Sequence, residues 1–149
     1  IQKGQAAENF RFVAYAAEGM TNPLNQLYIV NNTFVNDRLE GGQFVFLKAQ
    51  PQYVKVINNI FAGPGTVLQG GTGELSHNLV SNRPGLREAN NFDYHLISDS
   101  RAIDAGIDPG TADGFSLMPL HEYMPNVGTR ARPVVGRIDL GAYEYEARD

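Results

Sequence analysis

Lys55 is the side chain in this sequence best placed to do chemistry, because an aromatic residue occupies the matching position of a repeated phrase. The phrases are YIVNNTF (28–34) and KVINNIF (55–61), so Tyr28 precedes Lys55 by 55 − 28 = 27 residues. If the phrases stack, both side chains lie on one outer surface. An aromatic ring beside an ammonium suits stacking on a sugar ring while pairing with its carboxylate, and a lysine that loses its proton can be the base of a polyuronate lyase. A solvated lysine lying over a tyrosine is the alternative.

Other candidates for chemistry are fewer. No catalytic residue and no metal ligand is assigned. The three histidines are too scattered for a metal motif, HExxH and GxSxG motifs are absent, and the glycine-rich stretch 63–73 lacks the Lys-Ser/Thr ending of a phosphate-binding loop. The substrate-binding candidates are Tyr28 and Lys55, with Tyr53, Lys48 and His77 as weaker companions.

The repeat also predicts the elements that position these side chains. Aligning the asparagine pairs places the apolar residues Leu27 and Ile29 opposite Val54 and Val56, all facing inward by alternation. A degraded third copy, SHNLVSN (76–82), follows the second at an offset of 78 − 59 = 19 residues. Strand-built units of roughly 20–30 residues are typical of a β-solenoid, in which each unit is one turn of a coil.

The asparagine pair has a physical reason to recur. Asparagine tolerates the left-handed backbone of a sharp corner, and its amide can bond the asparagine of the next coil. Coils stack at roughly 4.8 Å, so a ladder of amides can form. Ordinary hairpin turns in a β-sandwich are the alternative. Short strand-like runs precede the three signatures: 9–16, 44–49 and 66–69.

Composition narrows the class of protein. A chain of 149 residues, 42% hydrophobic and 19% charged, suits one globular domain. A net charge of −4 argues against nucleic-acid binding, and the lack of cysteine excludes disulfides and thiolate chemistry. No run of about 18 apolar residues predicts a membrane span. Because Ile1 is preceded by no initiator Met or signal sequence, we expect a piece of a longer protein.

Several phrases of this sequence resemble those of a known protein family. YIVNNTFVN and KVINNIFAG resemble coils of right-handed parallel β-helix proteins, the pectin-lyase-like superfamily. FDYHLISDSRAIDAGIDPG (92–110) and RARPVVGRIDLGAYEY (130–145) resemble the closing segment of many bacterial secreted β-helix proteins, with Arg101 where proline is common. The resemblance implies an all-β, right-handed parallel β-helix of about three coils (1–91), a C-terminal capping segment of the same domain (92–149), and an extracellular or cell-surface setting. It does not imply one activity.

The closing phrases are predicted to cover the open end of the last coil. Ile103, Ile138, Leu140 and Ala142 supply the apolar surface, and Gly106 and Gly141 allow close backbone approach. Two aspartates inside these phrases need partners, and we expect backbone amides or nearby arginines to provide them. The aspartates are Asp104 and Asp139, and the arginines are Arg130, Arg132 and Arg137.

The stretch between the phrases, 108–129, has no clear period and is predicted to be a long surface loop. No cofactor is expected. Asp104, Asp108 and Asp113 form an oxygen-rich group that could hold calcium, but the spacing fits no EF-hand and turn capping is the favoured explanation.

Three functions remain open. The first is a non-catalytic C-terminal part of a secreted bacterial β-helix protein that binds or supports polysaccharide. The second is part of a polysaccharide lyase or glycoside hydrolase acting on acidic polysaccharide, so enzymatic activity is undecided. The third is an adhesion or spike-like module. The expected partners are polysaccharide or an upstream β-helix portion of the parent protein, without nucleic acid or a membrane span.

Overall fold

A computed structural model describes residues 1–125 and 128–147, and the chain is all-β, as predicted. In these residues the single helical element is the short 3-10 turn η1 (Ala89–Asn91). Nothing helical in the described part of the chain is long or apolar enough to cross a bilayer.

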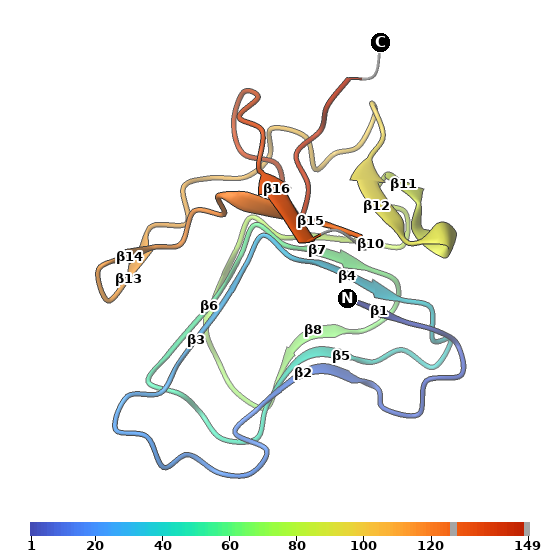
Figure 1. Ribbon diagram of the computed structural model, residues 1–149. Coiled ribbons are helices and arrows are strands. Elements are labelled where there is room, and N and C mark those ends of the chain that lie inside the picture. Colours follow the sequence, from blue (N-terminus) through green and yellow to red (C-terminus); the bar gives the residue numbers. More distant parts are fainter. Residues whose placement is uncertain (126–127, 148–149) are drawn as a thin grey trace.

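The first ten strands fall into three parallel sheets, which the chain visits in the same order on each pass. The sheet orders are β1-β4-β7-β10, β2-β5-β8 and β3-β6-β9, and Figure 1 shows the passes one behind another around a shared interior. The bounds are β1 (Gln2–Lys3), β2 (Arg11–Tyr15), β3 (Gln26–Val30), β4 (Thr33–Asn36), β5 (Gln43–Leu47), β6 (Tyr53–Ile57), β7 (Ile60–Ala62), β8 (Thr66–Gln69), β9 (Glu74–Ser76) and β10 (Leu79–Ser81).

The pairing register confirms both predicted offsets. Tyr28 pairs with Lys55 in the β3–β6 ladder, and Leu79 pairs with Ile60 in the β7–β10 ladder. The alternate apolar residues face the interior, where they form one buried cluster. Its members are Ile29, Phe34, Phe44, Val45, Leu47, Val54, Val56 and Phe61. Phe34 stacks on Phe61 with ring centroids 5.2 Å apart, so the same side chain recurs from pass to pass.

The asparagine corners form the predicted ladder. The first asparagine of each pair has a left-handed backbone conformation, with φ 51° at Asn31 and 58° at Asn58. The second bonds the next pass: the Asn32 N–H donates to Asn59 Oδ1 (2.8 Å), and the Asn59 N–H donates to Asn78 Oδ1 (2.9 Å). Because the pairing at these corners is parallel, the alternative of hairpin turns in a sandwich is wrong.

The closing segment covers a side of the stack, not its end, so that expectation was wrong. Leu140 packs in a second apolar cluster against the outer face of the β1-β4-β7-β10 sheet. The Gly141 N–H donates to the Asn58 carbonyl (2.7 Å), and the Ala142 N–H donates to Thr33 Oγ1 (3.0 Å). On the last strands, Leu75 and Val80 remain 45% and 55% exposed.

The reason for this placement is that β4 and β7 are apolar on both faces. All four residues of β4 and all three of β7 are buried. Their outward side chains, among them Val35 and Ile60, need a cover, and the second cluster supplies it with Leu96, Ala102 and Leu140. Continuous apolar runs such as TFV and IFA are typical of strands buried on both faces.

The predicted long loop 108–129 contains strands, which corrects a second expectation. β13 (Thr111–Ala112) and β14 (Phe115–Ser116) form one antiparallel hairpin, and β15 (His121–Met124) pairs with β16 (Gly128–Ala131) in another. The Asp-Gly turn of the first hairpin has positive φ at both residues, 46° and 85°, as a tight two-residue hairpin requires. A further hairpin joins β11 (Leu86–Glu88) to β12 (Asp93–Leu96). Residues 126–127 of the predicted loop lie outside the described part.

The closing segment contains two ion pairs whose carboxylates are buried. Arg132 Nε donates to Glu144 Oε2 at 2.9 Å, with both side chains under 5% exposed. Arg130 contacts the fully buried Glu122 at 2.8 Å. Burial raises the pKa of Glu144 and of Asp139 above their ordinary values.

The two aspartates bond backbone amides, as predicted. Asp139 accepts hydrogen bonds from the N–H groups of Asp104 and Tyr145, each at 2.6 Å, and Asp104 Oδ1 accepts from the Arg137 N–H at 2.7 Å. The side chains of Arg130 and Arg132 pair with glutamates rather than with these aspartates.

Replacing Asn59 tests the ladder. Asn59→Ala removes the acceptor of the Asn32 N–H and the donor to the buried Ile29 carbonyl, so we expect the free energy of unfolding to fall by about 2–4 kcal/mol. Urea unfolding measures the change. The matched control is Asn32→Ala at the partly buried end of the ladder, expected to cost about 1 kcal/mol. Equal losses in the two variants would contradict the ladder.

Replacing Arg132 tests the buried ion pair. Arg132→Met leaves the Glu144 carboxylate without its cation, and we expect a loss of about 3–5 kcal/mol at neutral pH. Because burial raises the pKa of Glu144, the folded state takes up a proton at a higher pH than the unfolded state. The loss should therefore shrink as the pH falls towards 4.5, the ordinary value. Arg38→Met is the control, because its partner Glu40 is 89% exposed and the loss should be below about 1 kcal/mol. A pH-independent loss in Arg132→Met refutes the account.

Candidate functional site

The outer face of the β3-β6-β9 sheet holds the predicted binding residues. The ladders place Tyr28 beside Lys55 and Lys55 beside Glu74, so these three side chains form one column across the three strands. Gln26 and Tyr53 pair in a second column of the same face. Since alternate residues of these strands fill the interior, both columns face outward.

The two tyrosines form the aromatic part of this face. Their ring centroids lie 5.5 Å apart with planes inclined by 47°. The Tyr28 hydroxyl donates to Gln26 Oε1 (2.9 Å), and the Tyr53 hydroxyl donates to Glu74 Oε2 (2.7 Å). The bond to the Glu74 carboxylate is the main cause that raises the pKa of Tyr53. Tyr53 is 39% exposed, so its ring is available to a ligand while its hydroxyl is held in place.

Lys55 sits beneath an arm of the closing segment, defined here as residues 108–117. Its Nζ donates to the Pro109 carbonyl at 2.9 Å and lies 3.8 Å from a Glu74 carboxylate oxygen, and the side chain is 14% exposed. Figure 1 shows the β13–β14 hairpin of this arm beside the β3 and β6 strands. Both contacts bind the protonated ammonium, which suits a fixed cation that meets an anionic group.

The structure does not gather all five candidates. Tyr28, Tyr53 and Lys55 lie together. Lys48 is exposed at the corner after β5, where its N–H donates to the Tyr15 carbonyl, and His77 is exposed at the corner between β9 and β10. In the described residues, no hydrogen bond or ion pair joins either side chain to Tyr28 or Lys55.

Gln26 and Glu74 complete the face, and sequence reasoning missed both. The repeat offsets contain them: 53 − 26 = 27 matches the first offset, and 74 − 55 = 19 matches the second. Extending the asparagine alignment outward along each strand would have found them.

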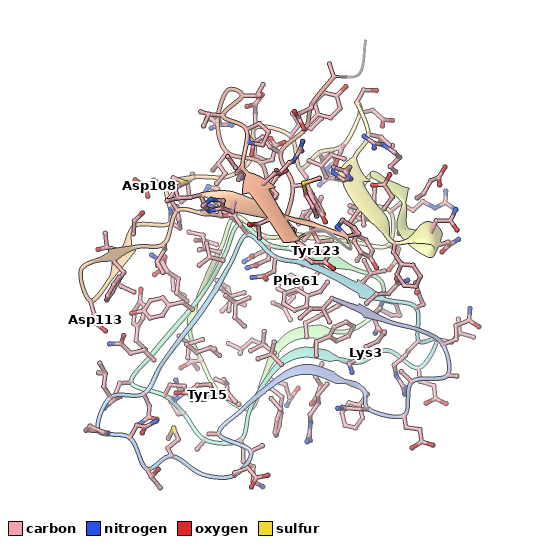
Figure 2. All side chains as sticks on the ribbon, viewed as in Figure 1. Lys3, Tyr15, Phe61, Asp108, Asp113 and Tyr123 are labelled. Carbon is pink, nitrogen blue, oxygen red and sulfur yellow. The ribbon has the colours of Figure 1, made fainter. Side chains whose placement is uncertain are left out.

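The candidate calcium aspartates act as turn residues. Asp108 Oδ1 accepts from the Gly110 N–H at 2.8 Å, and Asp104 caps the Arg137 N–H. Asp113 lies at the tip of the β13–β14 hairpin, well apart from Asp108 (Figure 2). Within residues 1–125 and 128–147 no group of three or more His, Cys, Asp or Glu side chains is arranged to hold a metal ion.

His95 has partners that its isolated position in the sequence does not suggest. Its Nδ1 lies 2.6 Å from Asp93 Oδ1, and its ring packs on Tyr143 with centroids 4.2 Å apart. Burial of Asp93 opposes its ionisation, but the bonds to His95 and the charge of Arg87 outweigh burial and lower the pKa of Asp93. The His95–Tyr143 contact fastens the β11–β12 hairpin to the last part of the chain.

No protein-family model, curated protein or solved structure matches the chain. The chemistry of the outer face therefore carries the functional argument. Two aromatic rings, one ammonium, one carboxylate and one amide on a rigid sheet can bind a polyhydroxylated ligand bearing a negative charge.

Proposed function

We propose that this chain is the C-terminal part of a secreted or cell-surface bacterial protein of the right-handed parallel β-helix type, and that it binds polysaccharide without acting on it. The observation that carries the proposal is the Tyr28–Tyr53 ring pair beside Lys55 on the outer face of one parallel sheet. Residues 1–91 are the coils of this proposal, and the closing segment that begins at residue 92 covers one side of them.

Three parallel sheets visited in turn support the β-helix part of the proposal. In the described residues, β1, β2 and β3 each pair on one side only, so the other edge is open to a further coil. An upstream β-helix portion of the parent protein is the partner that fits these edges.

The side chains of the face support glycan binding. Tyrosine rings stack on the apolar faces of sugars, while the Gln26 amide and the Glu74 carboxylate bond hydroxyl groups. An ammonium has three donors; here one bonds the Pro109 carbonyl, and the Glu74 carboxylate lies 3.8 Å away. A remaining donor can meet the carboxylate of an acidic sugar, so acidic polysaccharide is the preferred ligand class.

Removing the rings tests glycan binding. We expect Tyr28→Ala and Tyr53→Ala each to weaken binding of the chain to polygalacturonate or alginate roughly tenfold, since a ring stack contributes about 1–1.5 kcal/mol. Calorimetric titration against a panel that includes a neutral glucan measures the effect. Tyr123→Ala is the matched control, because Tyr123 is 61% exposed on the separate β15–β16 hairpin. Unaltered affinity in both test variants would rule out this face.

A polysaccharide lyase or hydrolase acting on acidic polysaccharide is the second candidate, favoured by the central position of Lys55 beside a tyrosine. The contacts of the ammonium favour a binding role, so we expect no unsaturated or shortened product when the chain is incubated with polyuronates. If product forms and Lys55→Ala abolishes it, the chain is an enzyme, and the proposal that it binds polysaccharide without acting on it is wrong. Lys48→Ala is the control for loss of one surface charge.

A further inference from the structure

A cleft separate from the tyrosine face is lined by side chains that can bind an anion. Its volume is about 750 Å³, within the range of about 300–1,000 Å³ typical of small-ligand sites. It lies between the turns that follow β4, β7 and β10 and the segment around the β11–β12 hairpin. The tyrosine face belongs to a different sheet, so the two surfaces are separate.

Three arginines line this cleft: Arg38, Arg83 and Arg101. Arg38 is engaged by the Gly41 carbonyl and by Glu40. Arg83 and Arg101 are exposed, and in residues 1–125 and 128–147 their guanidinium groups make no hydrogen bond or ion pair. Each therefore keeps five N–H donors for a ligand.

The backbone holds these two arginines close to each other. Ser100 Oγ donates to the Pro84 carbonyl at 2.7 Å, and the Ile97 N–H donates to the Gly85 carbonyl at 3.0 Å. Arg83 precedes Pro84 and Arg101 follows Ser100, so both arginines border this bonded pair, and both line the cleft. Two cations that line one cleft favour the entry of an anion.

The walls that carry these residues are closely packed. A Cβ on Gly85 would lie 2.8 Å from the Ser100 Cβ, and one on Gly63 would overlap the Asn36 carbonyl oxygen. Both glycines have positive φ, 81° and 91°, which other residues rarely adopt. The cleft is therefore formed before a ligand arrives, which reduces the ordering cost of binding.

The remaining polar groups of the cleft suit the hydroxyls of a sugar. Asn82 and Asn90 offer amides, and Asp99 offers a carboxylate that accepts hydroxyl donors. The second lining carboxylate, Asp37, already accepts from Gln2 Nε2 at 2.5 Å. Guanidinium groups in the same cleft as hydroxyl partners suit a sugar with a carboxylate or sulfate substituent.

We propose that this cleft binds an acidic oligosaccharide, with Arg83 and Arg101 holding its carboxylate or sulfate group. The proposal rests on the proposed function only in taking the ligand to be a glycan. It adds a second, charge-selective site to the aromatic face.

The test titrates the chain with trigalacturonate, with a sulfated heparin disaccharide, and with neutral maltotriose, by calorimetry. We expect one of the two anionic probes to bind, and which one it is identifies the anionic group. Arg83→Gln and Arg101→Gln should each weaken that binding roughly tenfold or more, since each removes charge-assisted hydrogen bonds. The guanidinium groups of both residues make no hydrogen bond or ion pair in the described structure, so the variants should unfold at the wild-type temperature. Arg83→Lys and Arg101→Lys should restore part of the binding by keeping the charge.

Lys48→Gln is the control, because it removes one exposed charge outside the cleft and should leave affinity unchanged. An anionic probe could also bind in a way that Tyr53→Ala abolishes and the arginine variants leave intact. That result contradicts the proposed cleft site and supports binding at the tyrosine face. Equal affinity for maltotriose, or no binding of either anionic probe, also overturns the cleft.

Discussion

The stacked asparagines where the β3-β6-β9 strands turn into the β4-β7-β10 strands are the constraint on which the rest of this structure depends. A sharp bend in a buried chain leaves backbone N–H and C=O groups that must be bonded. The second asparagine bonds the neighbouring pass, and Asn59 is fully buried while doing so. The first asparagine bonds the closing segment: Asn58 exchanges hydrogen bonds with the Ile107 carbonyl and N–H, and Asn31 donates to the Asp139 carbonyl. These corners therefore fix both the stacking of successive passes and the position of the closing segment.

Both proposed sites follow from that attachment. The arm that places the Pro109 carbonyl on Lys55 begins directly after Ile107, where Asn58 holds the chain. The arginine cleft is built where the chain leaves the last strand and returns along the stack, tied by the Ser100–Pro84 bond. The buried Arg132–Glu144 pair ties two stretches of the closing segment to each other. Covering the side of the stack therefore shapes the two surfaces on which ligands are proposed to bind.

The parts of this structure that could be predicted from sequence are those that repeat. The offsets of 27 and 19 place Tyr28, Lys55 and the asparagine ladder correctly, because a periodic pattern determines which residues are neighbours. The position of the closing segment could not be predicted in this way, since apolar phrases indicate burial but not the face that buries them. The Asp113–Gly114 pair is a local signal for the β13–β14 hairpin, because both residues adopt the positive φ that a two-residue turn requires. Arg83 and Arg101 share no motif, and a side-chain-to-backbone bond brings them together.

Native-state hydrogen exchange on Asn58→Ala tests most directly whether the corners hold the closing segment to the stacked strands. The informative amides are Gly106, which donates to the Ile138 carbonyl, and Leu140, which donates to the Ala102 carbonyl, because neither bonds Asn58. We predict that both lose protection together in the variant, while Val45 in the β2-β5-β8 sheet keeps its protection. If exchange quickens only at Ile107, whose bond the substitution removes, the corner is not what holds the segment in place.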